Sequence, residues 1–115
     1  MGSPVKARKR KSGNTPEGQA KRAIRDFLNL YGVWHYVQVQ GPLSARGVSD
    51  LVGIYKGRPL YIEVKAPGKR IKPGSEQERF LENVHERGGI AIEADGVESL
   101  VKGFERYGYK FNVLF

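Results

Sequence analysis

The stretch 50-DLVGIYKGRPLYIEVK-65 decides how this chain folds. It holds two runs rich in β-branched, aromatic and aliphatic residues, separated by the short polar segment Lys56-Gly57-Arg58. Such composition favours strands, and a short glycine-containing break between them favours a tight turn. We therefore expect strands over 50–55 and 59–65 that pair as a hairpin.

Side chains alternate between the two faces of a strand, so the second strand has two distinct faces. Leu60, Ile62 and Val64 share one face, and Tyr61, Glu63 and Lys65 share the other. Glu63 and Lys65 are then roughly 6.6 Å apart along the strand, at about 3.3 Å per residue. The hairpin also brings Asp50 beside the end of the second strand, so we expect two carboxylates and one ammonium to converge there.

A helix is predicted before the hairpin, with Thr15 as its N-cap and Pro16 as its first residue. Its apolar stripe consists of Ala20, Ile24, Phe27, Leu28 and Tyr31, and Gly32 ends it. The spacing puts Glu17 on the inward face and points Lys21 and Arg25 toward solvent.

Further elements are predicted from the same patterns. A strand is expected over 33–40, with Trp34 and Tyr36 in the core or on a sheet face, although stacking on an unpaired base at a junction stays open for both. His35 and His85 are expected in structural roles. Ser75 and Glu78 form a capping box for a helix that buries Phe80, Leu81 and Val84 and ends at Gly88, with Gln77 on the same side. A strand over 90–94 and a helix from Asp95, capped with Glu98, to about Tyr107 follow. The alternating tail, 109–115, is either an edge strand or a partner surface.

The predicted order, α-β-β-β-α-β-α with a C-terminal edge strand left open, indicates a mixed α/β sheet flanked by helices. It does not fit a doubly wound nucleotide-binding sheet, and no glycine-rich phosphate fingerprint follows a strand. With 115 residues, we expect a basic disordered arm over 1–14 and a single domain over 15–115.

Charge and composition narrow the class of protein. The net charge is +8, and the arm contributes Lys6, Arg8, Lys9, Arg10 and Lys11. Such an excess favours a polyanionic partner, although a solubilising or targeting tail has the same composition. The chain has no cysteine, which excludes disulfides, thiolate metal sites and a cysteine nucleophile. With no membrane-length apolar run and no signal-peptide core, we expect a cytoplasmic address, or a nuclear one where the host has a nucleus.

Asp50, Glu63 and Lys65 form the set that suggests chemistry. Paired carboxylates bind hard cations such as Mg²⁺, and a nearby lysine can orient water or stabilise growing negative charge. Hydrolysis of a phosphodiester needs these groups. An E-x-K triplet by itself is equally well a surface ion pair worth little.

Three motifs together resemble the VRR-NUC (virus-type replication–repair nuclease) branch of the PD-(D/E)XK superfamily. They are GVSDL at 47–51, YIEVKAPGK at 61–69 and SEQERFL at 75–81. Ser49 stands where a proline is frequent in the family. The resemblance implies a restriction-endonuclease-like core.

It also implies a role for each matching residue. Asp50 and Glu63 would bind Mg²⁺ or Mn²⁺ together with the main-chain carbonyl of Val64. Lys65 would be the catalytic lysine. Glu17 would match an acidic residue that completes the metal and water network, and Gln77 a helix glutamine beside the lysine.

Small members of this family resemble Holliday-junction resolvases, so the resemblance implies a homodimer that nicks branched DNA, in the host cytoplasm if phage-encoded, with no organic cofactor. The expected DNA contacts are Arg46, Lys69, Arg70 and Lys72, with the basic residues of the arm. Two alternatives stay open: a module that binds nucleic acid without cutting it, and a nuclease acting on flap, single-stranded or linear DNA.

Overall fold

The computed structural model describes residues 15–39, 41 and 46–113. The predicted arm, 1–14, with its five basic residues, lies outside the described residues. Three helices and four strands follow in the order α2 (Pro16–Leu30), β1 (Trp34–Val37), β2 (Leu51–Tyr55), β3 (Arg58–Val64), α3 (Glu76–Glu86), β4 (Ile90–Ala94) and α4 (Val97–Arg106). This is the expected mixed α/β order, with β1 shorter than predicted.

The strands form one mixed sheet in the order β1-β2-β3-β4. β1, β2 and β3 pair antiparallel, and β4 joins β3 in parallel. The hairpin between β2 and β3 closes at the pair Tyr55 and Arg58, so its loop is Lys56-Gly57. Both loop residues have positive φ, 52° and 77°, as the turn that matches strand twist requires. A parallel pair needs a crossover, and α3 supplies it between β3 and β4.

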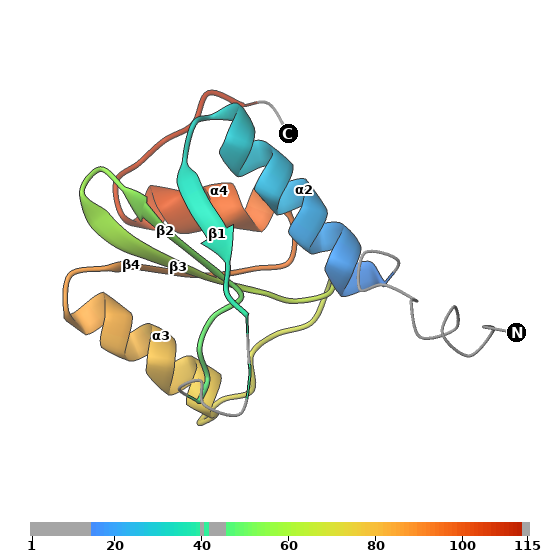
Figure 1. The fold of residues 1–115 in the computed structure, drawn as a ribbon, viewed down its shortest axis with the longest axis vertical. Helices are drawn as coiled ribbons and strands as arrows, with labels where there is room; N and C mark the ends of the chain where they lie inside the picture. Colours follow the sequence, from blue (N-terminus) through green and yellow to red (C-terminus); the bar gives the residue numbers. More distant parts are fainter. Residues whose placement is uncertain (1–14, 40, 42–45, 114–115) are drawn as a thin grey trace, which may run out of the picture.

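The core lies on one face of the sheet, beneath α2 and α4. Figure 1 shows these two helices together, with α3 on the opposite side of the sheet. The core residues are Ala20, Ile24, Phe27, Leu28, Val33, Leu51, Leu60, Ile62, Val64, Ile90, Ile92, Ala94, Leu100, Val101 and Phe104. The predicted apolar face of β3 is therefore confirmed, and that of the first helix is confirmed from Ala20 to Leu28. Its last predicted member, Tyr31, is the C-cap and is 38% exposed.

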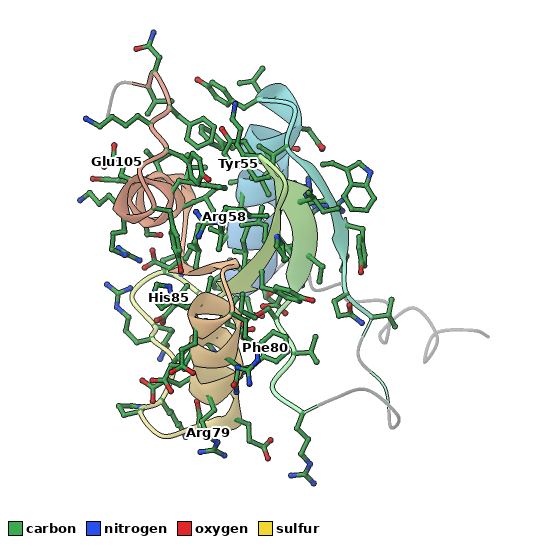
Figure 2. All side chains as sticks on the ribbon, turned by 90° about the vertical axis from the view of Figure 1, so that its left-hand side faces the viewer. Tyr55, Arg58, Arg79, Phe80, His85 and Glu105 are labelled. Atoms are coloured by element: carbon green, nitrogen blue, oxygen red, sulfur yellow. The ribbon has the colours of Figure 1, made fainter. Side chains whose placement is uncertain are left out.

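Helix α3 buries its apolar stripe less completely than predicted. Phe80, Leu81 and Val84 are only half-buried, and no residue of α3 is fully buried. Phe80 packs edge-to-face on Tyr61 of β3, with ring centroids 5.1 Å apart. Figure 2 shows Arg79, Phe80 and His85 along α3. The Nδ1 atom of His85 lies 2.8 Å from the hydroxyl oxygen of Tyr107. The helix therefore covers the sheet loosely.

The start of α4 and the tail also differ from prediction. Gly96 is the N-cap of α4, and the expected capping partner Glu98 pairs with Lys102 instead. Asp95 accepts hydrogen bonds from the Gly68 amide and the Ser99 hydroxyl, and these bonds lower the pKa of its carboxyl.

The segment 109–113 forms no strand. Instead, the Phe111 ring packs edge-to-face on Phe27 and Phe104. Such ring contacts stabilise the segment without strand pairing. No helix among the described residues is long and apolar enough to cross a membrane.

Candidate active site

The hairpin brings Asp50 beside Glu63, as the sequence predicts. Leu51 pairs with Ile62, so the next step of the register sets Asp50 opposite Glu63. The Asp50 Oδ2 atom accepts a 2.9 Å hydrogen bond from the Val64 amide. In a strand, the N–H and C=O of one residue point to the same side. The Val64 carbonyl therefore faces the side on which Asp50 lies.

Glu63 is the buried charged residue of the site, with 4% of its surface exposed. Its pKa is raised to about 7, first because burial disfavours the charged form and next because the Asp50 carboxylate lies nearby. Glu17 raises the pKa further, whereas Lys65 lowers it. The Lys65 Nζ atom lies 3.6 Å from Glu63 Oε2. Burying a carboxylate beside two others is costly, so this arrangement is not what folding stability alone would favour.

The first turn of α3 holds the lysine in place. The Ser75 hydroxyl caps this helix by accepting a hydrogen bond from the Glu78 amide, so Gln77 lies in the first turn. Gln77 Oε1 accepts a 3.2 Å hydrogen bond from Lys65 Nζ. The predicted position of Gln77 beside the lysine is therefore confirmed.

Gly47 brings the loop before Asp50 against the same turn of α3. Its φ is +75°, and a Cβ added there would overlap the main-chain carbonyl of Glu76. Only glycine permits this conformation together with so close an approach. The loop and α3 thus form two walls around the carboxylates.

Helix α2 supplies two more charges. Glu17 is exposed, so its predicted inward orientation is wrong, but it lies near enough to act on Glu63. Lys21 was expected in solvent; instead its Nζ atom lies 3.7 Å from Asp50 Oδ1. Arg25 also turns inward and donates to the ring of His35. Lys21 follows Glu17 by four residues and thus shares its helix face, a signal that would have revealed it.

These side chains line a pocket of about 480 Å³. Its residues are Glu17, Gly47, Val48, Asp50, Glu63, Lys65, Ser75, Glu76 and Gln77. An adjoining pocket of about 410 Å³ shares Glu17, Lys65, Ser75 and Gln77 and adds the exposed cations Lys69, Arg70 and Lys72. The predicted DNA-binding cations of the loop over 66–74 therefore line this adjoining pocket, which we call the cationic groove.

A slightly larger pocket, of about 510 Å³, lies between α3 and β4. It is lined by four glutamates, at 78, 82, 86 and 93, with His85 and Arg106 among their neighbours. It contains no buried charged residue. We regard the smaller pocket as the functional one because a buried carboxylate, a second carboxylate and a lysine meet there.

The donor atoms in this pocket fit a divalent cation. Asp50, Glu63 and the Val64 carbonyl offer oxygen ligands, which Mg²⁺ and Mn²⁺ prefer. A cation there would offset the repulsion that raises the pKa of Glu63. Across the described ranges, no three His, Cys, Asp or Glu side chains group closely enough to hold a metal by themselves. A cation in this pocket would therefore be held by the two carboxylates of Asp50 and Glu63 and by the main-chain carbonyl of Val64.

Other predicted residues lie outside the pocket. Arg46 forms an exposed 3.2 Å ion pair with Glu76 at the start of α3. His35 and His85 each bond within the fold, to Val33 and Tyr107, in keeping with structural roles. Trp34 and Tyr36 lie on a sheet face, not in the core.

Comparison of the chain with models of protein families, with curated proteins and with solved structures finds no match. The functional assignment therefore rests on the residues and their geometry.

Proposed function

We propose that this protein is an Mg²⁺- or Mn²⁺-dependent endonuclease that hydrolyses phosphodiester bonds in DNA. The observation that carries the proposal is the buried Glu63, set between Asp50 and Lys65 in a pocket beside a cationic groove. A buried carboxylate with a raised pKa, in a cleft and beside a second carboxylate, is typical of catalytic and metal sites. An ordinary surface ion pair would need none of this burial.

The bound metal would supply an activated water and neutralise charge on the phosphoryl oxygens. Asp50 and Glu63 would hold it, and the Val64 amide orients Asp50 through its hydrogen bond. Lys65 is directed by Gln77 and Glu63, so its ammonium can orient the attacking water or stabilise the negative charge of the transition state. Lys69, Arg70 and Lys72 would bind flanking phosphates.

Branched DNA is the substrate class that we favour, cut by a homodimer, as the resemblance to small junction-resolving nucleases implies. A two-fold protein suits a two-fold junction. A cytoplasmic location is part of the same expectation.

The test is nicking of labelled four-way, flap and linear DNA, with and without Mg²⁺ or Mn²⁺. We expect metal-dependent cleavage by the wild type, and its loss in both Asp50→Ala and Lys65→Ala with DNA binding largely kept. The matched control is Lys102→Ala, which removes an exposed lysine on α4 whose ion-pair partner among the described residues is Glu98. Undiminished cleavage by either site variant would reject the proposal, and binding without cleavage by the wild type would favour a binding module.

A further inference from the structure

Strand β1 carries an exposed aromatic pair that the proposed reaction does not use. Trp34 is 62% exposed and Tyr36 45% exposed, and their ring centroids lie 5.7 Å apart. Ile54, which pairs with Trp34 across the sheet, is 54% exposed. Side chains of this size are usually buried, so a cluster of them on one surface marks a binding site.

This aromatic surface, formed by Trp34 and Tyr36, lies on the same sheet face as the pocket. Tyr36 pairs with Val52, which pairs with Tyr61, so these side chains share one face. Asp50 lies two residues from Val52 on β2, and Glu63 lies two residues from Tyr61 on β3, both toward the same end of the sheet. Trp34 lies two residues from Tyr36 on β1, toward the opposite end. The Gln38 amide donates to the Asp50 carbonyl, which extends the pairing to the pocket. Two residues span about 7 Å, so Tyr36 lies on the strand beside Asp50, about 7 Å further along, and Trp34 lies one such step beyond.

The helix on this face leaves the aromatic surface open. α3 packs on β3 and β4, where Phe80 meets Tyr61. The β1–β2 half of the face carries the exposed residues. A row therefore runs from the cationic groove, through the carboxylates, to two rings.

We propose that Tyr36 and Trp34 form a stacking platform for unpaired bases of the DNA strand whose phosphate occupies the carboxylate pocket. This inference rests on the proposed function and specifies its substrate: the strand is unpaired on the β1 side of the cut. Bases in an intact duplex are stacked on one another and do not offer their faces without being extruded. Aromatic side chains bind any unpaired base in this way.

Charge favours a nucleic-acid strand over a second copy of the chain on this surface. Each copy carries a net charge of +8, so two copies repel each other, whereas a DNA strand is attracted. The adjoining groove with Lys69, Arg70 and Lys72 continues the same path with cations suited to phosphates.

The test uses the fact that Trp34 is the only tryptophan in the chain. Its fluorescence is titrated in EDTA with an oligothymidylate and with an abasic oligonucleotide of equal length. We expect quenching by the oligothymidylate alone, and affinity lower by about 5- to 150-fold in Tyr36→Ala, the value of one stacked base. Leu30→Ala, which removes an exposed apolar side chain at the end of α2, should change neither.

Several results would overturn the platform. They are tight binding of oligothymidylate without quenching, equal quenching by the abasic strand, or a blue shift that grows with protein concentration without DNA, which would indicate a second copy. Cleavage of branched DNA by the wild type without such quenching would reject the platform and leave the nuclease standing. Quenching without any cleavage would reject the nuclease and support the platform.

Discussion

The two faces of the sheet differ in how fully they are covered. The face under α2 and α4 is packed with fully buried apolar side chains, whereas α3 on the other face buries no residue completely. Strand β3 contributes to both, since Ile62 faces the core and Glu63 the pocket. One well-packed face therefore stabilises the fold, while the other leaves room for a pocket, a buried charge and exposed aromatic rings.

Truncating one phenylalanine on each face tests this contrast most strongly. Phe104 is fully buried and packs on Tyr55 and Phe111, so Phe104→Ala should cost about 3–5 kcal/mol. Phe80 is half-buried, so Phe80→Ala should cost about 1–2 kcal/mol. Urea unfolding measures both, and equal losses would mean that α3 packs as tightly as the core helices do.

Two glycines with positive φ allow a test of the wall formed by the loop and α3. Gly47 would clash with the Glu76 carbonyl if it gained a Cβ, whereas Gly68, at φ +82°, has open space around it. Gly68→Ala should cost about 1–2 kcal/mol from the left-handed backbone alone. Gly47→Ala should cost more and should also lower nicking, because it displaces the turn that carries Gln77. Similar stability and activity in the two variants would show that this close approach is unimportant.

The buried carboxylate predicts an unusual pH dependence in the metal-free protein. The pKa of Glu63 is about 7 in the folded state, against an ordinary value of 4.5. Between pH 4.5 and 7 the folded state holds a proton on Glu63 that the unfolded state has lost. The contribution of Glu63 to the free energy of unfolding is therefore fully present below about pH 4.5 and is lost as the pH rises through 7. Glu63→Gln should therefore be more stable than wild type at pH 8, by on the order of 1–3 kcal/mol.

Thermal unfolding in EDTA from pH 4 to 8 measures this difference. A stability gap between Glu63→Gln and wild type that does not widen with pH would contradict the burial of a charged Glu63.

The smallest expected effect is at Ser49, and Ser99 is its matched comparison. Ser49 is fully buried, and its hydroxyl has no hydrogen-bond partner among the described residues. Ser49→Ala should therefore change stability by less than about 1 kcal/mol, or raise it. The Ser99 hydroxyl bonds to Asp95 and Gly96, so Ser99→Ala should cost about 1–3 kcal/mol. A larger loss at Ser49 in chemical unfolding would show that its hydroxyl has a partner.

Local patterns were enough to predict the hairpin, the core face of β3 and the meeting of Asp50, Glu63 and Lys65. The reason is that turn chemistry and two-residue alternation act over few positions, and pairing through a two-residue loop sets the register. Cap chemistry and periodicity put Gln77 on the inner side of the first turn of α3. Its place beside Lys65 was implied by the family resemblance and not by the local pattern.

Tertiary packing decided the rest. The spacing from Glu17 gives the helix face on which Lys21 lies, but Lys21 reaches Asp50 because α2 lies across the end of the hairpin. No pattern within 16–30 specifies which part of the sheet that face meets. The alternation of the tail suited an edge strand or a partner surface, whereas Phe111 packs on the buried rings of Phe27 and Phe104 at the edge of the core. Periodicity shows which side chains share a face; which faces meet depends on how much apolar area each arrangement buries across the whole chain.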